Sequence, residues 1–315
     1  MYMERCLDKT SSPFVLEGLR SKVRWWAWCP EAFVKARRED KPVLVDVGAV
    51  WCHWCHVMDE TTYDDGEVAE VINQFFVPIK VDRDERPDID RRLQEAAAAL
   101  SGQAGWPLTV FMTPDGEVIW AATYLPPRGQ YGLPGMASVL KAVLTAYRER
   151  RGQIRLLNDD LTRELSSWHS PHPGEADRGV QLDVLAQLAS AFDDEFGGFG
   201  DAPKFPPVTP LDLLLLRYFY DGRYRVMLEK TLSAMALGGV YDQVGGGFFR
   251  YSTDRMWAVP HYEKLLVDNG ELLSIYARAY ALLGRSLYRE TAAGVVNWLD
   301  EFMRDPAGGY YASQM

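Results

Sequence analysis

The residues that decide the fold lie at 45–60 and read VDVGAVWCHWCHVMDE. Cys52 and Cys55 stand three positions apart, each is followed by a histidine, and a run rich in valine precedes them. That run, at 43–47, predicts a short buried strand, and the segment from the cysteines to about Glu60 predicts a helix. Such a pair serves as a redox couple, as part of a metal-binding site or as a haem attachment site. The sequence on either side is needed to choose between these functions.

The flanking segments predict an α/β order around the pair. Apolar residues at helical spacing predict helices at 30–39, 68–75 and 88–100, and a second buried strand is expected at 75–82. Residues 105–121 predict a β-hairpin, and two further helices follow, up to about residue 168. This order is typical of a thioredoxin-like fold: a strand, a CxxC at a helix start, a helix, a strand, a helix, and a hairpin that begins with a proline.

Length and pattern predict two domains. A chain of 315 residues exceeds the size at which one hydrophobic core usually stops growing. We expect an α/β thioredoxin-like domain at 1–170, a linker at 171–179 and an all-α domain at 180–315. In the second domain, helices are predicted at 180–194, 211–220, 223–238, 261–284 and 286–304, separated by glycine-rich loops.

Composition limits the partners and the location. Lys and Arg number 34 against 44 Asp and Glu, which gives a net charge of −10 and no basic block that would bind nucleic acid. The N-terminus shows no signal-peptide pattern, and no run approaches the ~18 apolar residues of a membrane span. We therefore expect a cytoplasmic protein that binds neither nucleic acid nor membrane. The four cysteines do not predict a disulfide scaffold, and Cys6 and Cys29 receive no role.

Longer motifs carry a family resemblance. The stretch VLVDVGAVWCHWC resembles the thioredoxin active-site strand and loop, and Pro107 matches the position of the thioredoxin cis-proline. Four segments within residues 10–313 resemble the spermatogenesis-associated protein 20 family: WCHWCHVMDETTYDD, FVPIKVDRDERPDID, GQAGWPLTVFMTPDG and VPHYEKLLVDN. This resemblance implies a thioredoxin-like domain joined to a six-hairpin α-toroid related to sugar epimerases and glycosidases. The sequence departs from the usual pattern of this family at two places. Val50-Trp51 stands where members commonly have a Ser-Thr pair, and Asp46 stands where they commonly have a serine. Both differences bring the site closer to true thioredoxins.

The predicted function is thiol–disulfide oxidoreduction. Cys52 is the expected nucleophile, because unpaired N–H groups and the dipole at a helix start stabilise a thiolate. Cys55, expected to be more buried, would resolve the mixed disulfide. Asp46 is expected to lie buried behind the pair with a raised pKa and to exchange the Cys55 proton, and His53 is expected to favour the thiolate. The expected partners are a protein or small disulfide substrate and a reductase, and no cofactor is predicted.

Other interpretations of the pair stay open. CHWCH satisfies the haem pattern C-x-x-C-H, which needs an exported chain, and a zinc site built on Cys52, Cys55 and His56 lacks a second ligand pair downstream. The pair could also be inert. We interpret His56 as a packed, hydrogen-bonded side chain and the run DRDERPDID as a solvated loop. The side chains expected to wall a substrate surface are Trp51, Trp54 and Trp106.

The second domain offers a separate candidate site. His261, Glu263, Lys264 and Asp268 place ionisable groups near one predicted helix start. His261 and Glu263 are the candidate substrate-binding residues of a carbohydrate-active, epimerase-like enzyme, which is an alternative function. A non-catalytic binding protein that uses both domains as interaction surfaces is the third hypothesis.

The helix count predicts an incomplete toroid. Residues 180–315 predict about five helices, whereas six hairpins need twelve. The last apolar stripe would then lack a partner, and we expect self-association through the C-terminal helices, no epimerase activity, and dithiol activity confined to residues 1–170. The stripe consists of Val295, Trp298, Leu299 and Phe302.

Overall fold

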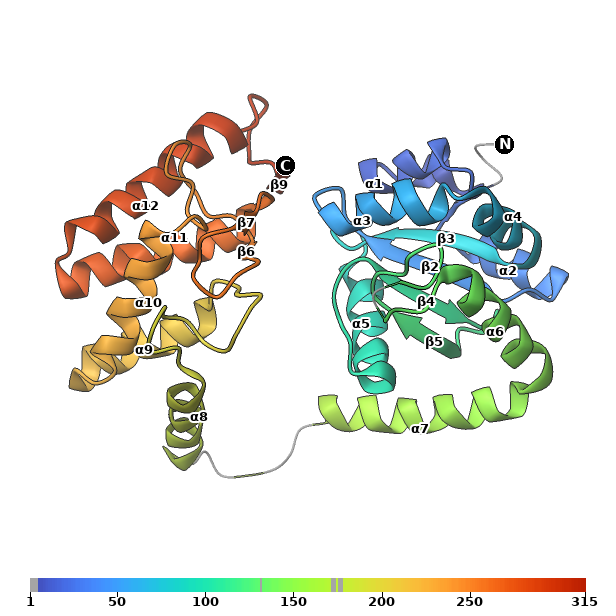
Figure 1. The fold of residues 1–315 in the computed structure, drawn as a ribbon, viewed down its shortest axis with the longest axis horizontal. Helices are drawn as coiled ribbons and strands as arrows, with labels where there is room; N and C mark the ends of the chain where they lie inside the picture. Colours follow the sequence, from blue (N-terminus) through green and yellow to red (C-terminus); the bar gives the residue numbers. More distant parts are fainter. Residues whose placement is uncertain (1–4, 131, 171–173, 175–177) are drawn as a thin grey trace. The chain divides into compact units, whose positions relative to one another are not determined.

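The computed structural model describes residues 5–130, 132–170, 174 and 178–315. The chain divides into two compact units, Met1–Pro173 and Gly174–Met315, and each is described here by itself (Figure 1). Most of the predicted linker at 171–179 lies outside the described residues.

The first unit is built on a five-stranded mixed sheet with the strand order β1-β3-β2-β4-β5. Strand β3 is parallel to β1 and β2, β4 is antiparallel to β2, and β5 is antiparallel to β4. All residues of β2, β3 and β4 are buried, which explains their nearly continuous apolar sequences. The strands are β1 Trp26–Ala27, β2 Val43–Gly48, β3 Val77–Asp82, β4 Leu108–Met112 and β5 Val118–Ala122.

Helices cover both faces of this sheet, so the unit has a thioredoxin-like fold (Figure 1). Ile72 and Leu140 belong to a core cluster that also holds Leu44 of β2 and Phe111 of β4. The helix predicted after the cysteines ends at Met58 and passes into one π-helical turn at Asp59–Tyr63. The helices are α1 Pro13–Glu17, α2 Pro30–Glu39, α3 His53–Met58, α4 Gly66–Phe75, α5 Pro87–Ser101, α6 Met136–Glu149 and α7 Arg151–His169.

The second unit is an array of helices joined by glycine-rich loops. Its helices are α8 Arg178–Ala191, α9 Val208–Asp221, α10 Arg225–Leu237, α11 Leu266–Leu283 and α12 Ser286–Trp298. Short strands interrupt the loops, which the prediction of helices alone had missed: β6 Tyr251–Ser252 pairs with β7 Pro260–His261, and β8 Lys264–Leu265 pairs with β9 Ser313–Gln314. The helix predicted from residue 261 therefore begins at Leu266.

Two loops of the second unit repeat the same construction. Asp193 N–H donates to Gly198 O at 3.0 Å, and Asp242 N–H donates to Gly247 O at 2.9 Å. A buried lysine fastens each loop, since Lys204 Nζ donates to Gly197 O and Lys264 Nζ to Gly246 O, both at 2.8 Å. The glycines at 197, 198, 246 and 247 all have φ between 71° and 79°, a conformation that side chains disfavour. The array is thus a structural repeat whose loops need glycine.

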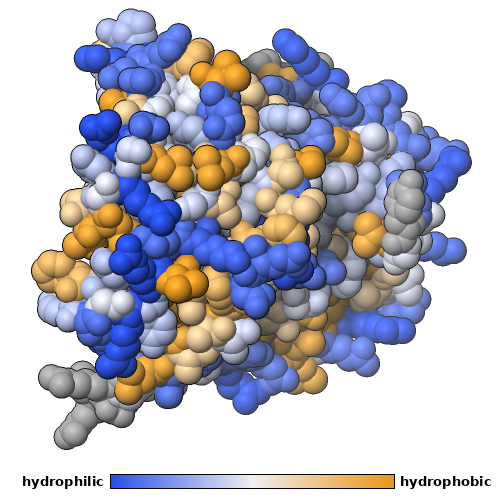
Figure 2. Space-filling model, turned by 60° about the vertical axis from the view of Figure 1, so that its left-hand side comes forward, coloured by the Kyte–Doolittle hydropathy of each residue, from blue (hydrophilic) through white to orange (hydrophobic). Residues whose placement is uncertain are grey.

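Only part of the apolar stripe predicted to lack a partner is covered within its own unit. Val295 and Trp298 are fully buried, and Trp298 Nε1 donates to Gln314 Oε1 at 2.6 Å. Phe302 keeps 45% of its surface exposed, and Leu299 packs partly against the core. For Val295 and Trp298 the prediction of an unpartnered stripe was wrong, because Gly247 packs on Trp298, and self-association of the chain stays a prediction. On the face drawn in Figure 2, hydrophobic side chains lie in small groups between hydrophilic ones.

Candidate functional site

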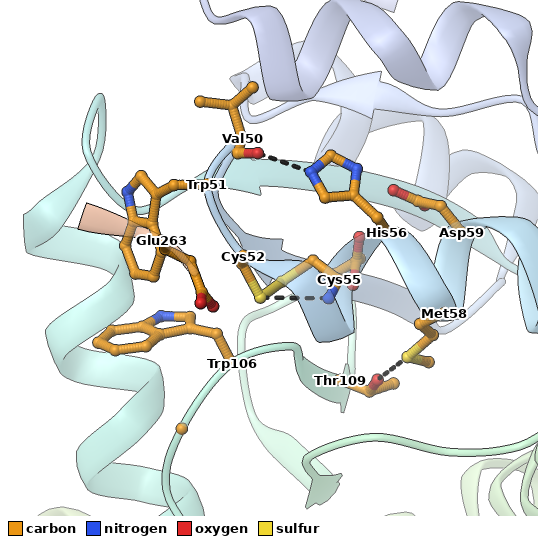
Figure 3. The surroundings of a disulfide bond; sticks show 12 residues. Val50, Trp51, Cys52, Cys55, His56, Met58, Asp59, Trp106, Thr109 and Glu263 are labelled. Atoms are coloured by element: carbon orange, nitrogen blue, oxygen red, sulfur yellow. Dashed lines mark hydrogen bonds between the residues drawn. A yellow bond between two sulfur atoms is a disulfide. The ribbon is translucent and has the colours of Figure 1, made fainter. Parts of the chain in front are cut away.

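The cysteine pair lies where strand β2 gives way to helix α3. Cys52 is the N-cap of α3 with an extended backbone, and its N–H donates to Ala49 O at 3.0 Å. Cys52 and Cys55 form a disulfide, and Cys55 N–H donates to Cys52 Sγ at 3.2 Å (Figure 3). Each residue is only 2% exposed, so the prediction that Cys55 is more buried than Cys52 was wrong. The backbone donor at the helix start is aimed at the sulfur predicted to be the nucleophile.

Gly48 brings the strand close to the disulfide. A Cβ atom at this position would lie 2.7 Å from Cys55 Sγ and 2.5 Å from Phe14 Cζ. Side chains two residues apart on a strand share a face of the sheet. Asp46 therefore points to the face on which Cys55 lies, and at 2% exposure it is buried there as predicted.

A buried lysine accompanies Asp46. Lys80, opposite Asp46 in the parallel register of β3, places Nζ 2.9 Å from Asp46 Oδ2 and 2.7 Å from Asp59 Oδ1. Tyr63 OH donates to the other oxygen, Asp46 Oδ1, at 3.3 Å. The Lys80 side chain is fully buried and that of Asp46 is 3% exposed, whereas that of Asp59 is 24% exposed. The three charges thus run from the interior towards solvent.

Burial and charge shift the pKa values of this cluster. Burial raises the pKa of Asp46 above its ordinary value, and the positive charge of Lys80 only partly opposes this effect. Burial alone would lower the pKa of Lys80, but the two carboxylates outweigh it and raise that pKa. Lys80 therefore stays protonated, while Asp46 binds a proton more readily than an exposed aspartate does.

Two tryptophans flank the Cys52 side of the disulfide (Figure 3). The Trp51 and Trp106 rings meet edge to face with centroids 5.8 Å apart. Trp51 Nε1 donates to Asp84 Oδ2 at 2.7 Å, and Trp106 Nε1 donates to Asp90 Oδ1 at 2.8 Å. The DRDERPDID run is therefore more than a solvated loop: Asp82 and Asp90 are buried, and two of its carboxylates hold the tryptophans. The Trp106–Pro107 peptide is cis, as the thioredoxin resemblance implied.

The remaining aromatic and histidine candidates differ in exposure. Trp54 is 43% exposed, and its ring packs at a tilt of 59° against Tyr124 with centroids 5.3 Å apart. His53 is exposed, and its ring lies 5.9 Å from that of Trp54. His56 Nε2 is hydrogen-bonded to Val50 O at 2.6 Å, which confirms the packed interpretation of this histidine.

The candidates of the second unit lie around the start of α11 at Leu266, as predicted, but His261 and Lys264 belong to short strands that precede the helix. His261 lies on β7 and Lys264 on β8, where Lys264 Nζ donates to Asp242 Oδ2 at 2.7 Å. Only Asp268 occupies the first turn of α11. Glu263 is 4% exposed, and its Oε2 atom lies 3.5 Å from His261 Nδ1. The His261 ring stacks on Tyr251 with centroids 4.5 Å apart.

Sequence reasoning missed two features of the first unit. The first is the Lys80–Asp59 pair: a single lysine inside the apolar strand FFVPIKVD signals that a buried counter-ion is needed. The second is a Cys6–Cys29 disulfide between cysteines that received no role. They stand 23 residues apart without a motif, so no local signal predicted their pairing. No helix among the described residues is long and apolar enough to cross a membrane.

These features together define a class of protein. The CxxC pair lies at the start of the helix that follows a central strand. A buried carboxylate lies on the same face of the sheet, and the domain has a cis-proline. Together these features define a thioredoxin-like dithiol domain. Residues 4–166 match the family described as Thioredox_DsbH, protein of unknown function DUF255. The chain belongs to this family and, with its second unit, to the spermatogenesis-associated protein 20 family.

Individual relatives extend the similarity over the whole chain. The human spermatogenesis-associated protein 20 is 37% identical over 96% of this chain and 40% of its own length. The cellobiose 2-epimerase of Bacteroides fragilis is 37% identical over 73 residues, 23% of this chain and 19% of its own. A solved structure titled DsbH Oxidoreductase, 20% identical, covers 41% of this chain and 86% of its own, with a TM-score of 0.30. The chain spans less than half the length of the human relative.

Proposed function

We propose that this chain is a thiol–disulfide oxidoreductase in which Cys52 attacks and Cys55 resolves. The observation that carries the proposal is the hydrogen bond from Cys55 N–H to Cys52 Sγ at 3.2 Å at the start of α3, and Asp46 lies buried on the same face of the sheet as Cys55. A backbone donor aimed at sulfur stabilises a thiolate more than a thiol. Cys52 is thus the sulfur that ionises first in the reduced protein.

The first step forms a mixed disulfide. The Cys52 thiolate attacks one sulfur of a substrate disulfide, the substrate S–S bond breaks, and one substrate sulfur leaves as a thiolate. The oxidised pair is 2% exposed at each residue, so a substrate reaches Cys52 only when the side chains around it move. The partly exposed Trp106 ring supplies apolar surface for a peptide substrate, and Trp51, at 1% exposure, supports this ring from the interior.

The second step releases the reduced substrate. Cys55 loses its proton, its sulfur attacks Cys52 Sγ, and the Cys52–Cys55 disulfide forms as the second substrate sulfur leaves. Asp46 accepts the Cys55 proton, for which its raised pKa suits it. Lys80 holds the carboxylate in place, and Asp59, 24% exposed, connects the cluster to solvent. A cytoplasmic location, which we also propose, would supply a reductase or thiol pool to regenerate the dithiol.

Turnover of insulin disulfides with dithiothreitol tests this function. The wild-type chain is expected to precipitate reduced insulin, and C52S/C55S is expected to lose the activity. C6S/C29S removes the same number of cysteines elsewhere and must remain active. Equal rates with wild type and C52S/C55S would refute the proposal.

A second candidate function rests on Glu263. This carboxylate is 4% exposed, its Oε2 atom makes no hydrogen bond to the described residues, and His261 Nδ1 lies 3.5 Å from it. Beside it, Phe205, Tyr251 and His261 form a stacked series with centroids 4.7 and 4.5 Å apart. Aromatic faces next to a buried acceptor suit a sugar-like polyol, so we infer binding without epimerisation. Calorimetry with cellobiose, using E263Q as the variant, tests this inference, and equal heats from both proteins would exclude it.

A further inference from the structure

The Cys6–Cys29 disulfide ties the N-terminal segment to the start of helix α2. Both cysteines are buried, at 1% and 4% exposure, and Cys29 is the N-cap of this ten-residue helix. The segment at residues 5–20 has no strand of its own, and its helices are short. Side-chain contacts therefore decide whether it stays in place.

Beyond Cys6, the segment is fastened at the end of strand β3. Thr10 Oγ1 donates to Glu85 Oε2 at 2.6 Å, and Ser12 Oγ donates to Asp82 Oδ2 at 2.5 Å. Ser12 also caps α1, because its Oγ accepts from Val15 N–H at 3.2 Å. The disulfide and the Ser12 anchor thus hold the two ends of the stretch that leads into α1.

Helix α1 delivers Phe14 to the dithiol site. The Phe14 ring is fully buried, and Lys80 Nζ lies 4.1 Å from its centroid. Phe14 Cζ and Cys55 Sγ also lie around one point, the vacant Cβ position of Gly48, at 2.5 and 2.7 Å from it. The segment that the second disulfide fastens therefore forms part of the packing around Cys55 and Lys80.

We propose that Cys6 and Cys29 are a second redox-active thiol pair, a modification site for dithiol reductants whose state sets the reactivity of Cys52. The surroundings accommodate the reduced form. Glu31 Oε2 lies 3.5 Å from Cys6 Sγ as an acceptor for its thiol, and Lys9 Nζ holds that carboxylate at 2.7 Å. Cys29, at a helix N-terminus, is the better leaving thiolate.

The modification is a balanced exchange. A dithiol donates two electrons and two protons, the Cys6–Cys29 bond breaks, both cysteines become thiols, and the reductant leaves as a disulfide. Once the bond is open, the polar anchors and the buried side chains of Leu7, Phe14 and Val15 alone hold the segment, and local opening of residues 5–20 becomes easier. Phe14 then packs less firmly against Lys80 and Cys55, and we expect Cys52 to react faster.

The first arm of the test does not depend on the proposed function. In C52S/C55S, Cys6 and Cys29 are the only cysteines left. This chain is equilibrated with mixtures of reduced and oxidised dithiothreitol, free thiols are trapped, and tryptic cleavage after Lys9 and Arg20 is timed. We expect reversible reduction with unchanged circular dichroism and about tenfold faster cleavage in the reduced chain. Reduction only when the whole chain unfolds, or equal cleavage rates, would overturn the proposal.

The second arm measures coupling to Cys52 and rests on the proposed function. C6S/C29S removes the disulfide, whereas S12A keeps it and removes the anchor at Asp82. Both variants are expected to raise the alkylation rate of Cys52 about threefold or more, and S166A, at an exposed serine of α7, is expected to leave it unchanged. Equal rates in all variants overturn the coupling. If only insulin turnover fails, the proposed function is refuted, but the first arm still tests whether Cys6 and Cys29 are redox-active.

Discussion

At the scale of single residues, the site depends on one buried lysine between two carboxylates. Lys80 Nζ lies within 2.9 Å of both Asp46 and Asp59. The CxxC, Asp46 and Pro107 could be predicted from the sequence, because each has a fixed spacing or a known counterpart. Lys80 was missed because a lysine in a strand looks solvent-directed until its pairing register with Asp46 is known. Cys6 and Cys29 were missed because they stand 23 residues apart without a motif.

Replacing Asp46 tests its role as proton acceptor. D46N is expected to slow disulfide exchange about tenfold or more while Lys80 keeps Asp59 as its partner and the fold persists. The acceptor is the ionised form, so the wild-type rate should rise with pH through a midpoint above 3.8, because the pKa is raised. D46N should lose that rise. Stopped-flow exchange against pH measures both effects, and identical profiles would make Asp46 a structural residue only.

Replacing Lys80 tests the cluster as an electrostatic unit. K80M leaves the buried Asp46 without a counter-ion, and we expect a loss of about 3–5 kcal/mol in the free energy of unfolding. K230M, at a partly exposed lysine of the second unit that donates to the Asp194 carbonyl, serves as a control and should cost less than about 1 kcal/mol. Urea denaturation measures both values. A similar small loss in both variants would mean that Lys80 does not neutralise Asp46.

At the scale of elements, the long strands and helices of the first unit could be predicted, and the very short ones could not. Strands β2 and β3 are uniformly apolar except for their paired charges, and α2 begins at Pro30 as expected. Strands β6 to β9 have two residues each, too few to show any periodicity. Their pairing places His261 and Lys264 on strands that precede the helix predicted from residue 261, and this helix begins at Leu266 instead.

The junction of β2 and α3 can be tested with two matched glycine variants. G48A would place Cβ 2.7 Å from Cys55 Sγ, whereas a Cβ at Gly66 meets nothing within 4 Å. We expect G48A to lower the stability of the oxidised protein by about 1–3 kcal/mol, and G66A to change it by less than about 0.5 kcal/mol. Thermal unfolding compares the two variants. If G48A and G66A were equally stable, strand β2 would have to lie farther from the Cys52–Cys55 disulfide.

At the scale of the whole molecule, each unit has its own core and its own candidate site. The first core is formed between the sheet and its helices, and the second between the helices of the array. The two-unit organisation followed from the change in periodicity near residue 180. Burial of Val295 and Trp298 did not follow, because a loop that packs on a helix shows no stripe in the sequence.

The independence of the units predicts where the dithiol activity lies. A chain cut after Ser170 ends just beyond α7 and keeps every residue of the Cys52 site and the whole N-terminal segment. We expect it to fold and to retain insulin turnover within about twofold of the full chain. An inactive but folded fragment would place part of the site in the second unit.

Light scattering on the full chain tests the predicted self-association. Phe302 is the residue of the predicted stripe that stays exposed, and it lies on the π-helical turn that follows α12.

The proposed role of Cys52 as the attacking thiolate can be measured through the pH dependence of its alkylation. The reduced chain is treated with iodoacetamide across a pH series, and peptide mapping separates labelling at Cys52 from labelling at Cys55. Because Cys55 N–H is aimed at Cys52 Sγ, we predict that Cys52 is labelled first, with a midpoint below the ~8.5 of a free thiol. A midpoint at or above that value, or earlier labelling of Cys55, would contradict the account.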